Sequence, residues 1–245
     1  RDARNLRALV HRRLRRSDVS RDDADLALGD DSCVLSGGSG FWFASAAASV
    51  LCCIPLFLSF EKRAPSAGEL VLIAVMTAFS AAGRFIFAPV PFFKPVSAIV
   101  ALAARHLGPQ AGFMIGALSA VISNIWFGQG PWTPFQMLCW GLIGAAAGIL
   151  GKHGWISKPL PLCIFGIASG IGYSFIMDVW TVLSMNGSFS GELWIAAIIS
   201  AAPVTAVYCV SNVVFLLALN KPLGKKLERL KTKYGIFTSD GGNIT

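Results

Sequence analysis

The stretch SNIWFGQGPWTPFQM, residues 123–137, joins two apolar segments that each approach the thickness of a membrane. The segments cover residues 110–127 and 134–151, and neither contains a charged residue. Crossing about 30 Å of hydrocarbon takes about 20 apolar residues in a helix. A plain turn between two helices would use fewer polar and aromatic side chains than this stretch holds. Residues 123–137 therefore predict two membrane helices whose connection does more than reverse the chain.

The composition extends this prediction to the whole chain. Its 245 residues are 54% hydrophobic and only 14% charged, whereas roughly a quarter of the residues in soluble domains are charged. The apolar segments are residues 41–60, 69–88, 95–107, 110–127, 134–151, 159–185 and 193–219. The third is too short to cross upright, so we expect it to be tilted or shielded by its neighbours. The fold class is an all-α polytopic membrane protein.

Basic residues mark one side of this membrane. The basic connectors are residues 61–63, 105–106, 151–158 and 220–233. The opposite connectors, which hold one Lys in total, are residues 89–94, 128–133 and 185–192. Seven spans place all the basic connectors on one side, which should be the cytoplasmic side and should include the C-terminus. The net charge of +8 therefore reflects orientation in the bilayer and gives no evidence of a nucleic-acid partner.

The N-terminal part of the chain has a different character. Residues 1–40 contain eight Arg and seven Asp, and we expect a charged tail and linker, or the end of an extracellular domain. Residues 41–60 carry no charge and are long enough to form an additional transmembrane helix. The alternative is that they do not span, which leaves six helices with both ends inside. Residues 236–245 are expected to form a short C-terminal tail.

Polar side chains gather near the outer ends of four segments. A charge or an amide within a membrane is expensive, so each such residue is a functional-site hypothesis. A few polar groups among apolar and aromatic walls suit a small ligand. Simpler roles stay open, because Asn124 could cap a helix and Arg84 could pair with Asp178. The candidate substrate-binding residues are Arg84, Asn124, Gln129, Trp132, Gln136, Asp178 and Trp180.

The inner half of the predicted spans holds few polar groups, with Asn212 as the exception. This asymmetry argues against a channel or an autonomous carrier, which would need a polar path to both faces. The three His lie outside the spans, and Asp178 is the only carboxylate well inside one, so we predict no catalytic or metal site. The chain has no P-loop and cannot power transport itself. A membrane scaffold or a membrane-embedded enzyme remains the alternative.

Small residues form a stripe on the segment 69–88. Ala74, Ala78 and Ala82 repeat every four residues, which places them on one side of a helix where a second helix can approach closely. Spacing alone leaves both a partner-docking role and internal packing open. We assign the glycines within 112–116, 144–148 and 166–170 to internal packing.

Four stretches of the chain resemble the substrate-binding S components of energy-coupling factor (ECF) transporters. The most specific part is FGQGPWTPFQM at residues 127–137. The resemblance is closest to the cobalamin-type subgroup. The four stretches are residues 60–87, 94–137, 177–184 and 211–235.

The resemblance implies a definite architecture and function. Residues 61–235 would form a six-helix core, with residues 41–60 as an extra N-terminal helix in a bacterial plasma membrane. The core would bind a vitamin or related micronutrient, a corrinoid among the candidates, at the extracellular face. Its partners would be a transmembrane T component and two cytosolic ATP-binding-cassette ATPases that drive uptake. Ala74, Ala78 and Ala82 match the position at which S components contact the T component.

Overall fold

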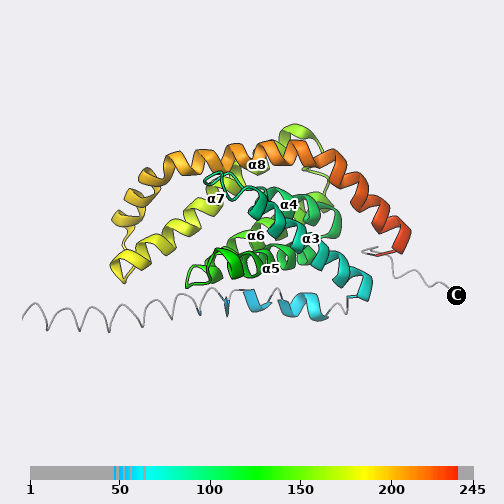
Figure 1. Ribbon diagram of the computed structural model, residues 1–245, viewed down its shortest axis with the longest axis horizontal. Coiled ribbons are helices and arrows are strands. Elements are labelled where there is room, and N and C mark those ends of the chain that lie inside the picture. The colour runs from blue at the N-terminus through cyan, green and yellow to red at the C-terminus, as the bar shows by residue number, and fades with distance from the viewer. Residues whose placement is uncertain (1–46, 48–49, 52, 56, 63–64, 237–245) are drawn as a thin grey trace, which may run out of the picture.

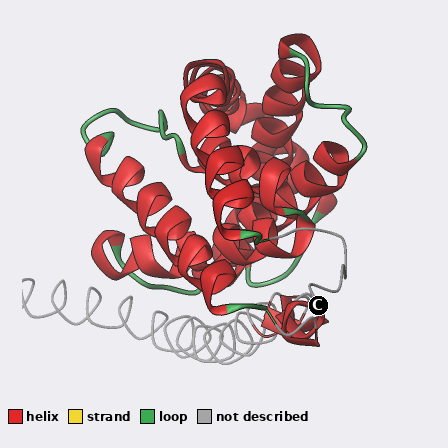
Figure 2. Cartoon of the chain, turned by 90° about the vertical axis from the view of Figure 1, so that its right-hand side faces the viewer, coloured by secondary structure: helices red, strands yellow, loops and turns green. Residues whose placement is uncertain are grey.

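The computed structural model describes residues 47, 50–51, 53–55, 57–62 and 65–236. All regular secondary structure within these residues is helical, as Figure 2 shows. Five of the helices are long and apolar enough to cross a membrane, and a sixth, α4, is shorter. The predicted class of an all-α polytopic membrane protein is confirmed. The helices are α3 (Ala67–Ile86), α4 (Val96–Leu107), α5 (Pro109–Phe127), α6 (Thr133–Lys152), α7 (Pro159–Asn186) and α8 (Gly191–Tyr234).

Local sequence signals explain where the helices begin. Ser66 and Glu69 form a capping box at the start of α3, in which each side chain accepts a hydrogen bond of 3.3 Å from the other residue's backbone N–H. Pro109, Pro134 and Pro159 occupy the first turns of α5, α6 and α7. A proline fits there because its missing N–H would have no helical partner.

The short helix α4 lies at the centre of the bundle (Figure 1). It packs against α3, α5, α6, α7 and α8, and nine of its 12 residues are buried. Twelve helical residues rise only about 18 Å, less than the hydrocarbon thickness. Since protein surrounds α4, its length does not have to match the bilayer. This confirms that the segment is shielded by its neighbours.

Glycines allow α5 and α6 to approach closely. An added Cβ on Gly112 or Gly144 would collide with the backbone carbonyl of the other residue. A Cβ on Gly116 would collide with the carbonyl of Trp140. The prediction that these glycines serve internal packing is confirmed, because only a hydrogen in place of the side chain leaves room for the facing helix.

Helices α7 and α8 form a long hairpin whose tip projects beyond the other helices, at the left of Figure 1. Gly187 ends α7 with a φ of 69°, a backbone conformation that glycine adopts readily. Helix α8 has 44 residues, so it continues well past the predicted end of its span at residue 219. The connector expected at residues 220–233 is helical. Lys, Arg and Leu are good helix formers, so the basic residues interrupt the apolar pattern without ending the helix.

The described residues between 47 and 62 are helical and pack against α5. The rings of Phe57 and Phe113 meet edge to face with centroids 5.6 Å apart. Gln110 Nε2 donates a hydrogen bond of 3.0 Å to Ser59 Oγ. A transmembrane role for residues 41–60 remains a prediction, while the predicted tail at residues 1–40 and most of the C-terminal tail lie outside the described residues.

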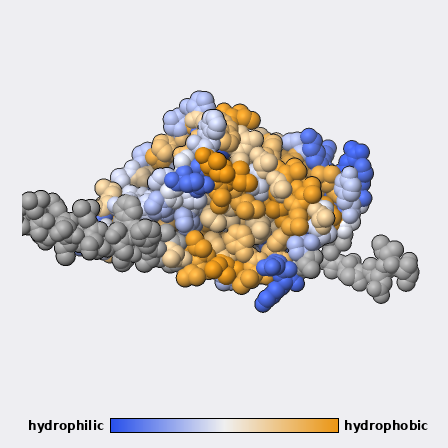
Figure 3. Space-filling model, turned by 60° about the horizontal axis from the view of Figure 1, so that its bottom comes forward, coloured by the Kyte–Doolittle hydropathy of each residue, from blue (hydrophilic) through white to orange (hydrophobic). Residues whose placement is uncertain are grey.

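The outer surface of the bundle is apolar. Figure 3 shows a broad hydrophobic area across the middle of the molecule, with strongly hydrophilic residues at the right-hand end. Large apolar side chains on several helices are more than half exposed, including Val71, Ile125, Ile164 and Ile199. Soluble monomers rarely expose apolar patches of this extent, and such a surface suits contact with lipid.

Candidate substrate-binding site

A cavity of about 330 Å³ lies beneath the loop that joins α3 to α4, residues 87–95. Helices α3, α4, α6, α7 and α8 each contribute to its walls. Four aromatic rings, two cations and two amides face it, and no Asp or Glu is among the lining residues that the structure describes. The lining residues are Arg84, Pro91, Phe92, Lys94, Val96, Ser97, Gln136, Trp140, Gly170, Tyr173, Tyr208 and Asn212.

Arg84 is held in this cavity by helix α5. Its Nη1 donates to Ser123 Oγ at 2.5 Å and to Asn124 Oδ1 at 2.7 Å. The fully buried Asn124 in turn donates from Nδ2 to Thr133 Oγ1 at 3.0 Å and to Gln136 Oε1 at 2.8 Å. Asn124 therefore lies behind the cavity and positions two residues, Arg84 and Gln136, that line it.

The loop between α5 and α6 extends this hydrogen-bond network beyond Asn124, on the side away from the cavity. Thr133 Oγ1 donates to Gln129 Oε1 at 3.0 Å, and Gln129 Nε2 donates to the carbonyl of Val121 at 2.7 Å. The indole of Trp132 lies over Gly130, where an added Cβ would collide with the ring. Neither Gln129 nor Trp132 lines the cavity. The polar residues of this loop therefore fix Asn124 through Thr133, and they do not form a roof over this cavity.

A series of aromatic rings in contact with one another begins at the guanidinium of Arg84. The guanidinium carbon lies 4.6 Å from the ring centroid of Phe127 and 5.2 Å from that of Trp140, which are cation–π distances. Trp140 and Tyr173 are stacked, with centroids 5.7 Å apart and planes inclined by 15°. Tyr208 meets Tyr173 edge to face at 5.2 Å. Of these rings, Trp140, Tyr173 and Tyr208 line the cavity and give it a polarisable wall beside the positive charge of Arg84.

Lys94 organises the loop above the cavity. Its ammonium donates to the backbone carbonyls of Phe87, of Ala88 at 3.1 Å and of Val90 at 2.8 Å. Phe92, at a φ of 58°, points its ring to the edge of Tyr208 with centroids 6.0 Å apart. Desolvation, followed by the nearby charge of Arg84, lowers the pKa of Lys94 below its ordinary value.

Two predicted residues lie apart from the cavity. Asp178 is buried, but its Oδ2 has no hydrogen-bond partner among the described residues, and it does not line the cavity. The suggested pair with Arg84 does not form, since that guanidinium binds α5 instead. Trp180 packs against Phe135 with centroids 5.5 Å apart. Both residues follow Tyr173 along α7, toward the projecting tip of the hairpin, whereas the sequence placed Asp178 at a depth similar to that of Arg84.

Several cavity residues were missed by sequence reasoning. Asn212 was assigned to the inner half, yet it faces the same cavity as Arg84. Tyr173 and Tyr208 were overlooked because charged side chains, amides and tryptophans were treated as signals and tyrosines were not. Lys94 did carry a signal, since it is the one basic residue in the outer connectors. A cation on the side that normally lacks them points to a specific role.

Comparison with known proteins assigns the chain to a family. Residues 65–229 match the family model described as ECF-type riboflavin transporter, S component. No match was found among curated proteins or among solved structures. The matched residues include α3 to α7 and most of α8, and thus every element that lines the cavity. The match supports a substrate-binding transporter subunit and does not confirm the cobalamin-type subgroup. The chain belongs to the S components of ECF-type riboflavin transporters.

Proposed function

We propose that the chain captures a planar heteroaromatic vitamin of the flavin type in the cavity beneath the α3–α4 loop, for ATP-driven uptake by partner subunits. The observation that carries this proposal is the combination of an aromatic wall with Arg84 and Gln136 on one side of it. Aromatic faces stack on a planar ring system, while guanidinium and amide groups donate to its carbonyl oxygens and ring nitrogens. The family match independently names a riboflavin transporter.

The size of the cavity favours a flavin over a corrinoid. Its volume is about 330 Å³, near the lower end of the roughly 300–1,000 Å³ typical of small-molecule sites. A fused three-ring heterocycle with a short polar chain is of this order. A corrinoid macrocycle with its side chains is several times bulkier, and this cavity would not enclose it.

Arg84 keeps donors available for a ligand. Among the described residues, both of its hydrogen bonds come from Nη1. Its Nη2 and Nε can therefore donate to an acceptor in the cavity. The Gln136 amide is held firmly at Oε1 by Asn124, but its Nε2 makes only a long contact of 3.4 Å with the Tyr173 hydroxyl. A ligand oxygen could replace that contact at little cost.

The sidedness of the charges supports capture from outside. Arg84 and the α3–α4 loop lie at the end of α3 opposite to Ser66. Basic residues cluster at the other end of the bundle, in the connector between α6 and α7 and at the end of α8. Because Lys and Arg prefer the cytoplasmic side, this distribution supports the proposed orientation, with the cavity in the extracellular half and the C-terminus in the cytoplasm. The membrane that we propose is a bacterial plasma membrane.

The alanine stripe on α3 supports docking of a T component. Ala74, Ala78 and Ala82 are all exposed, unlike Gly112 and Gly144, which are buried between α5 and α6. The stripe is thus free for a helix from another chain. In this proposal the T component binds there and connects the chain to two cytosolic ATPases.

Native mass spectrometry and flavin fluorescence test the proposed ligand. Protein purified in detergent should carry a co-purified flavin, or should bind added riboflavin and quench its fluorescence against Trp140. Thiamin, cobalamin and biotin serve as comparison ligands. Tight binding of cobalamin, or failure to bind any flavin under conditions in which the protein is folded, would refute the assignment of the ligand.

A further inference from the structure

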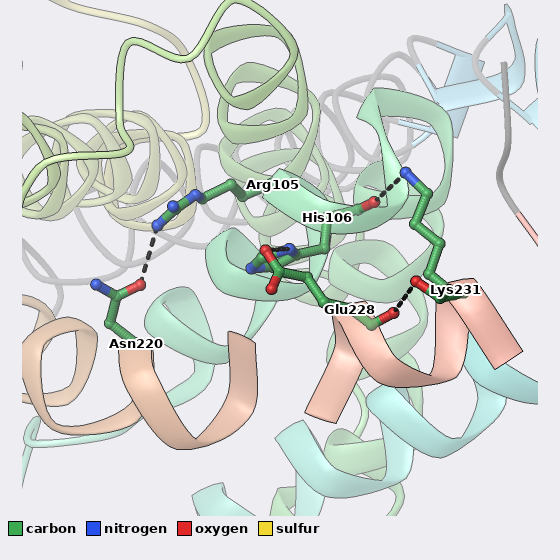
Figure 4. A network of polar contacts seen from close by, with 6 residues as sticks. Arg105, His106, Asn220, Glu228 and Lys231 are labelled. Carbon is green, nitrogen blue, oxygen red and sulfur yellow. Dashed lines mark hydrogen bonds and ion pairs between the residues drawn. The ribbon is translucent and has the colours of Figure 1, made fainter. Parts of the chain in front are cut away.

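The final part of α8 crosses the end of the bundle where α4 ends. Figure 4 shows three contacts that hold it there. Arg105 Nη1 donates to Asn220 Oδ1 at 2.9 Å, and Lys231 Nζ donates to the carbonyl of His106 at 3.3 Å. The carboxylate of Glu228 lies 3.9 Å from Nδ1 of His106. Two residues at the end of α4 therefore contact α8 along about three turns of its length.

The same segment then reaches the beginning of α3. Leu230 and Tyr234 line an apolar groove together with Gly68 and Val71. A Cβ added to Gly68 would lie 3.1 Å from Ile236 Cγ2. Residues 220–236 therefore run across one end of the bundle, from α4 to α3, and do not project away from it. This is the end that carries the basic connectors.

The segment is amphipathic, and basic residues dominate its outward side, which also includes the exposed Pro222 and Thr232. Leu223, Gly224, Leu227 and Leu230 turn toward the bundle and are buried or partly buried. Five exposed basic residues occupy an arc of about 140° on the other side of the helix, by the 3.6-residue period. This surface, named the basic face, consists of Lys221, Lys225, Lys226, Arg229 and Lys233.

The basic face lacks a counter-charge on its own segment. Like charges four residues apart destabilise a helix, and Lys221, Lys225, Arg229 and Lys233 form such a series. Glu228 is the one acidic residue between 220 and 236, and it is directed to His106. Within the described residues 220–236, one carboxylate therefore stands against the five cations of the basic face.

We propose that the basic face binds the anionic headgroups of phospholipids at the cytoplasmic membrane surface. The segment begins directly after the apolar stretch 193–219, which places it at the level of the headgroups. Its leucines are already used against the bundle, so it binds by charge and without insertion. A protein-binding surface would be expected to offer large aromatic or apolar anchors, and within the arc of the basic face the one apolar residue is the small Pro222. The inference does not depend on the identity of the transported ligand.

Hydrogen–deuterium exchange in defined bilayers tests this proposal. The full chain is placed in nanodiscs of phosphatidylcholine alone, or of equal parts phosphatidylcholine and phosphatidylglycerol. Backbone amides of residues 221–234 should exchange about tenfold more slowly in the anionic bilayer, as expected when several basic residues bind its surface. Raising the ionic strength should abolish the difference.

Two matched triple variants locate the effect. K225Q/R229Q/K233Q should remove the slowing, whereas K62Q/K152Q/K158Q, which removes three charges from other connectors on the same side, should retain it. Circular dichroism and thermal unfolding show whether each variant is folded, and the salt dependence of the unmodified protein provides a test that needs no variant. If the backbone amides of residues 221–234 in the unmodified protein exchange at the same rate in both bilayers, the proposal is overturned. Loss of the complex with the ATPase subunits in the first variant, without any lipid effect, would also overturn it and would identify the face as a protein contact.

Discussion

Asn124 on α5 accepts a hydrogen bond of 2.7 Å from Arg84 on α3, while its amide nitrogen donates to Gln136 on α6. The side chain is fully buried and uses both ends of its amide. An aspartate at this position could accept from Arg84 but could not donate to Gln136. One amide thus couples the polar loop after α5 to two of the polar residues that face the cavity, Arg84 and Gln136.

Replacing Asn124 with Ala should weaken both ligand binding and the fold. Arg84, Thr133 and Gln136 would each lose a partner in a buried site, at about 1–3 kcal/mol for an unsatisfied group. We expect the thermal midpoint to fall by several degrees and flavin affinity to drop about tenfold, since every 1.4 kcal/mol changes a binding constant tenfold. Fluorescence quenching and thermal unfolding measure the two effects.

The adjacent Ile125→Ala variant provides the control for Asn124→Ala. Ile125 is 74% exposed and faces away from the network, so its truncation should leave affinity unchanged. If Asn124→Ala binds flavin as well as Ile125→Ala does, the network does not position the cavity residues.

Arg84 should be sensitive even to replacement by Lys. Its planar guanidinium binds Ser123 and Asn124 through Nη1 and still presents further donors to the cavity, a geometry that a single ammonium cannot reproduce. Arg84→Lys and Arg84→Gln should each reduce flavin affinity by about 10- to 100-fold, the range expected for charged hydrogen bonds. Isothermal titration calorimetry measures the loss. Full affinity in Arg84→Lys would mean that charge alone matters at this position.

The Asp178→Asn variant tests whether the carboxylate of Asp178 has a structural role or contacts the ligand. Asp178 lies outside the cavity and leaves Oδ2 without a partner among the described residues. Removing a charge from a membrane-embedded site relieves a desolvation penalty. The variant should bind flavin within about twofold of the unmodified protein and should unfold at the same or a higher temperature. A tenfold loss of affinity would restore Asp178 as a candidate for ligand contact.

The fold was largely predictable because its signals are local. Apolar stretches of membrane length gave α3, α5, α6 and α7 within about two residues, and prolines marked several starts. The end of α8 was missed, since Lys221 to Lys233 break the apolar pattern while continuing the helix. Hydropathy reports contact with lipid, and it does not report where a helix stops.

The candidate site was only partly predictable because it depends on how far each helix is displaced along the membrane normal. Arg84 and Gln136 were identified from their position near segment ends. Asn212 and Asp178 were misplaced because the α7–α8 hairpin extends beyond its neighbours, so that equal distances from a predicted boundary are not equal depths. That offset is set by packing between helices far apart in sequence.

The alanine stripe on α3 can be tested against a matched pair on α8. Ala78→Leu/Ala82→Leu should reduce recovery of the T component with the affinity-purified chain by about tenfold, because branched side chains prevent close approach of helices. Ala202→Leu/Ala206→Leu changes two residues that are also exposed and also four apart, and it should leave recovery unchanged. Both variants should retain flavin binding, since neither pair lines the cavity. Equal losses in both would indicate a general effect of bulk on the lipid-facing surface, and full recovery with the α3 variant would exclude the stripe as the docking site.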